Sequence, residues 1–201
     1  MLCGTVEEMK NKRQTTSSGF SIIELLAVVG IFMVIAAMAV PNMMSAVADF
    51  RLRSNVSSTA SLMQRVRMEA VRTNQTMGLQ PTAAPGGKIK YYADKNNNGT
   101  LEGGEYELTL PKEVQSATSG APSALSGAAG FNFLAPGTPI RFNARGLPCV
   151  VTVGCAPDAG GNGFVYYFRD TRPLGVNGWA AITVSPSGRV RTWWWTGNNW
   201  R

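Results

Sequence analysis

Histidine is absent from this chain of 201 residues. Its absence removes the commonest general base, the usual partner of a nucleophilic serine and a frequent zinc ligand. The sequence also has no G-x-S-x-G stretch and no complete G-x-x-x-x-G-K-S/T stretch, because PGGKIK lacks both the first glycine and the hydroxyl residue. We therefore expect a protein that is not an enzyme and requires no cofactor.

Cysteine is also scarce, with three residues in the chain. Cys3 lies near the start, whereas Cys149 and Cys155 lie far along the chain. If a membrane separates the two parts, the C-terminal pair lies in an oxidising space and can form a disulfide, while Cys3 stays reduced. Two separately buried thiols are the alternative. The spacing is not C-x-x-C, so a disulfide here would give rigidity and not redox catalysis.

Charged residues make up only 15% of the chain, yet the formal net charge is +7. This positive excess permits attraction to nucleic acid or to an anionic surface. A chain of this length has room for one globular domain and one attached segment, which excludes a large multidomain protein.

One long apolar run spans Phe20 to Val40, and its only charge is Glu24. The run is long enough to cross a bilayer as a helix. An ionised carboxylate inside a bilayer costs about 2.5–3.5 kcal/mol, so Glu24 predicts a functional role; an incidental charge in a plain anchor is the alternative. Cations shortly before the run predict a cytoplasmic leader, with the residues after Val40 on the opposite side: Lys10, Lys12 and Arg13.

The leader and the apolar run together resemble a known processing signal. A short basic leader ending at Gly19 is followed by Phe20, Glu24 and an apolar helix in GFSIIELLAVVGIFMVIAAMAVP. This pattern resembles the class III signal of type IV prepilins and type II secretion pseudopilins. The resemblance implies that a prepilin peptidase cuts between Gly19 and Phe20 and methylates the new N-terminus. Pro41 lies where that family commonly has a helix-bending proline.

The resemblance also gives Glu24 a role. In a filament of packed helices the buried N-terminal ammonium of one subunit needs an anionic partner, and a carboxylate on a neighbouring helix supplies it. In the family this pairing sets the register of assembly, and breaking one partner of a buried pair costs about 3–5 kcal/mol. Glu24 is therefore expected to direct assembly with other pilins or pseudopilins.

After Pro41 the sequence is typical of an amphipathic helix, without glycine or proline between Asn42 and Met77. Apolar residues recur every three or four positions and predict one face packed under a sheet: Leu52, Val56, Ala60, Met63, Val66 and Ala70. The other face is basic, and we interpret it as solvated, with nucleic-acid contact as the alternative; it carries Arg51, Arg53, Arg65, Arg67 and Arg72.

Beyond Leu79 the pattern changes to short β-type runs separated by turn residues. They predict antiparallel sheet packed on the helix, and hence an α+β domain; they cover residues 89–93, 106–110, 140–142, 150–153, 164–168, 180–184 and 190–195. The stretch SATSGAPSALSGAAG, residues 116–130, is predicted to be an exposed loop. We divide the chain into a removed leader (1–19), a transmembrane and assembly segment (20–41), an amphipathic segment (42–78) and a β-rich domain (79–201).

Three later stretches narrow the resemblance to one branch of the pilin family. IRFNARGLPC, AAITVSPSGRVR and YYADKNNNGTLEGGEYEL are similar to the branch that contains the pseudopilin GspH and the minor pilins FimT and FimU. With the leader, the likeness covers most of the chain. It implies a type IV pilin-like fold, in which a long N-terminal helix, transmembrane and then amphipathic, packs on antiparallel β-sheet.

The stretch DKNNNGTLEGGE, residues 94–105, matches the calcium-loop template D-x-D/N-x-D/N-G that ends in glutamate. Few of its donors are charged, which predicts weak affinity, and the flanks are strands and not the helices of an EF-hand. The alternative is a β-hairpin whose Asn and Gly residues only make the turn. The candidate ligands are Asp94, Asn96, Asn98, Thr100 through its carbonyl, Glu102 and Glu105.

A basic group lies in SPSGRVRTWWWTGNNWR, residues 185–201. In FimT proteins implicated in natural transformation, a G-R-x-R motif is associated with DNA binding, and Gly188, Arg189 and Arg191 match it. Residues two apart share a face of a strand, so both arginines can approach phosphates. Burial of the nearby tryptophans is the alternative to stacking on bases; the residues expected to add to the site are Arg201, Trp193 and Trp195.

These features predict a minor pilin of this branch, inserted in the bacterial inner membrane by one span with its C-terminal domain in the periplasm. It would polymerise through its N-terminal helix, help to initiate or cap a pilus, and bind DNA for uptake. One alternative is a type II secretion pseudopilin that binds no DNA. Another is a membrane-anchored calcium-dependent binding protein that never polymerises. The expected partners are a prepilin peptidase, other pilins or pseudopilins, and DNA; calcium is the candidate cofactor.

Overall fold

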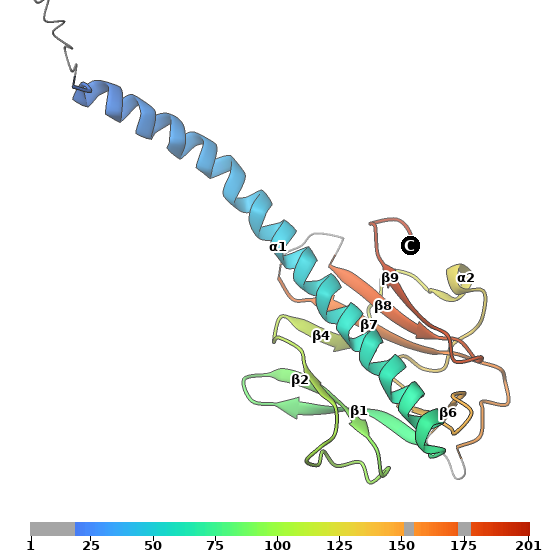
Figure 1. The fold of residues 1–201 in the computed structure, drawn as a ribbon. Helices are drawn as coiled ribbons and strands as arrows, with labels where there is room; N and C mark the ends of the chain where they lie inside the picture. The colour runs from blue at the N-terminus through green and yellow to red at the C-terminus, as the bar shows by residue number, and fades with distance from the viewer. Residues whose placement is uncertain (1–18, 151–154, 173–177) are drawn as a thin grey trace, which may run out of the picture. The chain divides into compact units, whose positions relative to one another are not determined.

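The computed structural model describes residues 19–150, 155–172 and 178–201 (Figure 1). The chain divides into two compact units, one up to Asn42 and the other from Met43 to Arg201. A long helix, α1, spans Ile22–Thr73 and belongs to both units. The division falls beside Pro41, which lies inside α1.

The first part of α1 is an apolar helix that begins directly after Ser21. The Ser21 carbonyl accepts the N–H groups of Glu24 and Leu25, both at 3.1 Å, which places Glu24 in the first turn. The most apolar window of α1 has a mean hydropathy of 2.7, and none of it is buried. Within the described ranges, α1 is the one helix long and apolar enough to cross a membrane.

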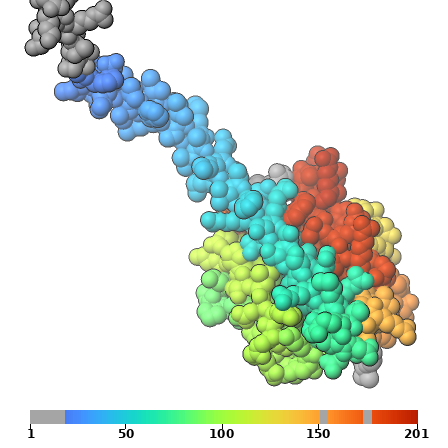
Figure 2. Space-filling model, in the orientation of Figure 1, coloured from blue at the N-terminus to red at the C-terminus, as the bar shows by residue number. Residues whose placement is uncertain are grey.

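From Met43 onward α1 buries one face. The six apolar positions that the sequence predicts for this face are all buried, so that prediction is confirmed; Ala48, Thr59 and Leu62 join them. Figure 2 shows the opposite side of this part of α1, coloured cyan to green, at the surface between yellow-green residues and the red C-terminal residues.

The end of α1 is set by a left-handed asparagine. Asn74 has a φ of 53°. Its N–H donates to the Val71 carbonyl, and the Gln75 N–H donates to the Ala70 carbonyl at 3.1 Å. This pair of bonds is a Schellman motif, which Asn can close in place of Gly. The helix therefore ends before residue 78, and the predicted boundary there is wrong.

Five antiparallel strands form the first sheet, in the order β3-β2-β1-β5-β6. The sequence does not predict β1, because PTAAPGG is typical of a turn. Pro81 is tolerated in β1 because β5 pairs only with Met77–Leu79, so no partner on that side needs its missing N–H. The bounds are β1 Met77–Ala84, β2 Lys88–Asp94, β3 Glu107–Thr109, β5 Ile140–Phe142 and β6 Pro148–Val150.

Four antiparallel strands form the second sheet, in the order β4-β7-β8-β9. Their bounds are β4 Val114–Ala117, β7 Phe164–Asp170, β8 Trp179–Val184 and β9 Val190–Trp194. The predicted exposed loop at 116–130 is partly wrong: it begins within β4, contains the short helix α2 at Ser126–Ala129, and buries Leu125 to 1% exposure.

The buried residues form two cores, one on each face of the second sheet. The first core joins α1 to both sheets and includes Phe164, Tyr166 and Ile182. The second core takes the alternate strand residues, such as Val165 and Tyr167, and is covered by Leu125. The α+β prediction is therefore confirmed, with two sheets in place of one.

Candidate functional site

Gly19, Phe20 and Glu24 lie together at the start of α1, and all three are exposed. The Phe20 side chain is 82% exposed. The Glu24 carboxylate makes no ion pair with any residue that the structure describes. An unpaired carboxylate at the start of an apolar helix favours a partner outside this chain. The leader cations and Cys3 lie outside the described residues.

The G-R-x-R motif begins in the hairpin turn between β8 and β9. The Gly188 N–H donates to the Ser185 carbonyl at 2.8 Å, and Gly188 has a φ of 84°. A β-carbon on Gly188 would lie 2.5 Å from the Gly146 carbonyl oxygen and 3.0 Å from Nε of Arg67. The glycine of the motif is therefore required by conformation and by space.

Both arginines of the motif are exposed. The Arg189 N–H donates to Oγ of Ser185 at 3.0 Å, which fixes its backbone at the turn. Arg191 lies in β9 opposite Thr183, and its guanidinium lies 4.6 Å from the ring centroid of Trp193. No carboxylate of the described residues forms an ion pair with either arginine. Both charges are thus available to an anion.

The tryptophans lie mostly in the second core, which favours burial, the alternative to stacking on bases. Trp193 is 6% exposed and Trp195 is 8% exposed. The Trp193 indole N–H donates to Oγ1 of Thr183 at 2.9 Å, and that of Trp200 donates to the Ser123 carbonyl at 3.2 Å. The cause is strand alternation, which turns Trp193 toward the face that Leu125 covers.

Arg201 is exposed and lies at the other end of β9 from Arg189. Its backbone N–H and carbonyl both bond to Trp194, at 3.0 and 2.7 Å. The structure therefore places Arg201 apart from the turn that carries the motif.

The β2–β3 connection holds the candidate calcium ligands. Asp94 is fully buried, and its two carboxylate oxygens accept the N–H groups of Asn98 and Gly99 at 3.1 and 3.0 Å. The Glu102 carboxylate accepts amide N–H groups from Asn96 and Asn98. Glu105 accepts the N–H groups of Lys95 and Glu102. The loop is thus closed by its own hydrogen bonds, which satisfy most of these oxygens.

The described residues include no group of three or more His, Cys, Asp or Glu side chains placed to hold a metal ion. The donor chemistry nevertheless suits a hard cation, since carboxylate and amide oxygens are what Ca²⁺ prefers. Tyr106 ties the loop to α1, because Arg65 lies 3.5 Å and Lys95 lies 4.5 Å from the centroid of its ring.

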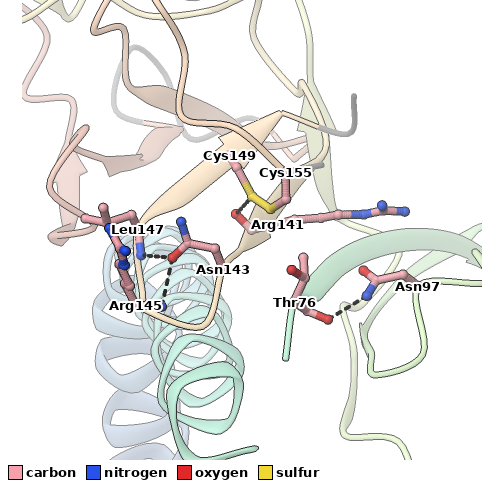
Figure 3. The surroundings of a disulfide bond; sticks show 8 residues. All are labelled: Thr76, Asn97, Arg141, Asn143, Arg145, Leu147, Cys149 and Cys155. Carbon is pink, nitrogen blue, oxygen red and sulfur yellow. Dashed lines mark hydrogen bonds between the residues drawn. A yellow bond between two sulfur atoms is a disulfide. The ribbon is translucent and has the colours of Figure 1, made fainter. Parts of the chain in front are cut away.

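Cys149 and Cys155 are joined by a disulfide with a Cα–Cα distance of 5.1 Å (Figure 3). Cys149 is in β6 and fully buried. The neighbouring β5–β6 turn is held by Oδ1 of Asn143, which accepts the N–H groups of Arg145 and Leu147 at 2.9 and 3.1 Å. The disulfide therefore ties residue 155 to the strand that follows this turn.

The described chain is thus an apolar N-terminal helix whose amphipathic continuation packs on antiparallel sheets. Residues 55–192 match the family described as Type II transport protein GspH. The chain therefore belongs to the GspH family of minor pilins and pseudopilins. Members of this family are structural subunits and not enzymes.

Individual proteins resemble this chain either over a part of its length or at low sequence identity. A pilin-like protein PilA1 of Thermus thermophilus is 32% identical over 90 residues, which are 45% of this chain and 56% of that protein. The type IV minor pilin FimU of Pseudomonas aeruginosa is 12% identical, with 75% of this chain and 92% of that chain covered and a TM-score of 0.47. The minor pseudopilin EpsH of the Vibrio cholerae type 2 secretion system is 11% identical, with 71% and 95% covered and a TM-score of 0.40.

Proposed function

We propose that this chain is a minor pilin that is cleaved by a prepilin peptidase between Gly19 and Phe20, is N-methylated on Phe20, and polymerises through α1. Before assembly it is anchored in the inner membrane by α1, with the β-rich domain in the periplasm. The observation that carries this proposal is Glu24, a carboxylate in the first turn of an exposed apolar helix, without an ion-pair partner in the described part of the chain. Membership of the GspH family supports it.

The test replaces Glu24 by alanine in the full chain. Glu24→Ala is expected to remain in the membrane fraction and to be absent from sheared filaments, because the N-terminus of a neighbouring subunit loses its partner. Glu69→Ala is the matched control, since Glu69 lies in the same helix and pairs with Arg72 at the surface. Unchanged incorporation of Glu24→Ala would favour an anchored protein that never polymerises.

We further propose that the subunit helps to initiate or cap a type IV pilus and captures DNA through Arg189 and Arg191. The support is the exposure of both arginines and the lack of carboxylate partners among the described residues. In neutral detergent, the full-length protein should bind duplex DNA, and Arg189→Ala/Arg191→Ala should lower the slope of log K against log salt by roughly 1.8 for two lost phosphate contacts. No binding at low salt would favour a type II secretion pseudopilin.

A second proposal concerns the β2–β3 loop, which we infer binds calcium weakly. The supporting observation is the buried Asp94, which shapes the loop by accepting the N–H groups of Asn98 and Gly99. Millimolar calcium should raise the melting temperature of the wild type, and Glu105→Gln should abolish the rise. Glu107→Gln, in the adjacent strand, is the control. A flat calcium titration of the wild type rejects the site.

A further inference from the structure

Two hairpin turns, one from each sheet, meet against α1. In the β5–β6 turn the Gly146 N–H donates to the Asn143 carbonyl at 2.8 Å, which matches the bond from Gly188 to Ser185 in the β8–β9 turn. Gly146 also has a positive φ, of 73°. A β-carbon on Gly188 would lie 2.5 Å from the Gly146 carbonyl oxygen, so the two turns are in contact.

Arg67 of α1 lies between these two glycines. Its Nε–H donates to the Gly146 carbonyl at 2.8 Å. A β-carbon would lie 3.2 Å from Arg67 Nε if placed on Gly146, and 3.0 Å if placed on Gly188. Arg67 is therefore half-buried and held in place, in contrast to the solvated position that the helical pattern predicts. Its other guanidinium N–H groups donate to no acceptor within the described residues.

Each of these two glycines has an arginine as its neighbour in the chain. Arg145 directly precedes Gly146, and Arg189 directly follows Gly188; both are exposed. The ion pairs of the described residues involve other arginines and lysines, so Arg67, Arg145 and Arg189 are not neutralised by a carboxylate. Uncompensated cations carried by two turns in contact raise the positive potential there, which favours the binding of an anion.

We propose that Arg67 and Arg145 belong to the same site as Arg189 and that this site binds the phosphodiester backbone of duplex DNA without reading its bases. The proposal rests on the DNA-binding part of the proposed function and adds residues from α1 and from the first sheet. Arginine suits phosphate because its fork of N–H donors matches the phosphate oxygens. Burial of Trp193 and Trp195 disfavours binding by base stacking, which exposed aromatic rings would provide.

The test measures salt-dependent binding of the full-length protein in neutral detergent to two fluorescent duplexes of unrelated sequence. Arg67→Gln and Arg145→Gln should each weaken binding roughly five- to tenfold and lower the salt slope by about 0.9, equally for both duplexes. Arg51→Gln, an exposed arginine of the same helix, is the matched control and should change neither quantity. Arg189→Gln is the positive reference.

The outcomes separate this inference from the function on which it rests. If Arg189→Gln weakens binding while Arg67→Gln and Arg145→Gln behave like Arg51→Gln, the extended site is wrong and DNA binding stands. If the wild type binds neither duplex at low salt, DNA binding itself fails, and the extended site with it. Arg67 is half-buried, so its replacement could lower stability as well as affinity, and the melting temperature of each variant is therefore measured. If Arg67→Gln is destabilised, the exposed Arg145 gives the deciding variant, Arg145→Gln.

A last arm tests the other anionic partner that such a surface could contact. Detergent-solubilised full-length protein is titrated with vesicles that contain phosphatidylglycerol and with neutral phosphatidylcholine vesicles, whose binding gives the contribution of α1 alone and is subtracted. Equal vesicle binding by the wild type and the three variants agrees with the DNA site. Loss of vesicle binding in the variants, with unchanged affinity for DNA, would assign the cations to a lipid surface and overturn the proposal.

Discussion

The hydroxyl of Tyr166 donates a hydrogen bond of 2.6 Å to the carbonyl oxygen of Thr138. This bond joins β7 to the segment before β5 and lies within the first core. Burial raises the pKa of the Tyr166 phenol far above its usual value, and burial also raises the pKa of Tyr91. The folded protein therefore keeps these two protons at a pH where the unfolded chain loses its own.

Alkaline pH is expected to lower the free energy of unfolding through these tyrosines. Below about pH 10 both states hold the phenol protons and the free energy does not depend on them. Above it the folded state binds more protons, so stability falls by up to about 1.4 kcal/mol per pH unit for each tyrosine. In urea titrations between about pH 10 and 11.5, Tyr166→Phe should show a flatter decline than the wild type and than the control Tyr106→Phe. Parallel declines would contradict the role of Tyr166.

A side chain at residue 188 is expected to lower the free energy of unfolding, because Gly188 lies where the β5–β6 and β8–β9 turns are in contact. Gly188→Ala adds a β-carbon 2.5 Å from the Gly146 carbonyl at a positive φ, and should cost about 2–4 kcal/mol. Gly86→Ala is the matched control, because Gly86 has a φ of 77° and open space around it; it should cost about 1–2 kcal/mol. Urea denaturation measures both, and equal losses would show that the contact does not matter.

Trp195→Phe is expected to affect stability and not DNA binding. The ring lies in the second core, 5.3 Å from that of Trp200, so the smaller side chain should cost about 1–2 kcal/mol. Affinity for duplex DNA should stay within roughly twofold of the wild type, because the buried ring offers no stacking surface. The reverse pattern, lost affinity with unchanged stability, would restore a direct role for the tryptophan.

Removal of the disulfide is expected to lower the free energy of unfolding. Closing this short loop contributes about 2 kcal/mol in the chain-entropy model, so Cys149→Ala/Cys155→Ala should lose about that amount under oxidising conditions. Cys3→Ala should change nothing, since the bond joins the other two cysteines. Dithiothreitol should lower the free energy of unfolding of the wild type and leave that of the double variant unchanged. If it leaves the wild-type value unchanged as well, the disulfide contributes no stability.

The amphipathic part of α1 could be predicted from sequence because its core positions follow helical spacing from Leu52 to Ala70. The end of α1 could not be predicted, because nothing in the sequence distinguishes an asparagine in the left-handed conformation, such as Asn74, from one inside a helix. The first strand could not be predicted because it contains Pro81. The missing N–H of this proline is harmless only because the pairing of β1 with β5 ends at Leu79. Such exceptions depend on strand register, which a single sequence does not display.

The candidate DNA site was predicted only along one strand. Alternation predicts Arg189 and Arg191 on one face of a strand, but whether that face is covered beyond Arg191 depends on Leu125, which is distant in sequence. Arg67 has the spacing of a surface arginine, and only the contact of two hairpin turns with α1 makes it a candidate for the proposed site. The nearest sequence signal is an arginine beside a turn glycine in both NARG and SGR.

The pairing of β4 with β7 has a consequence for how the chain folds. Val114 lies opposite Asp170, so this part of the second sheet closes only after the residues between them have been made. Non-local pairing of this kind slows folding and leaves apolar strands unpaired in the meantime. During synthesis the apolar part of α1 emerges before the β-rich domain, while the apolar residues of β7 and β8 arrive late. Until β9 is made, the edge of β8 that pairs with it stays open.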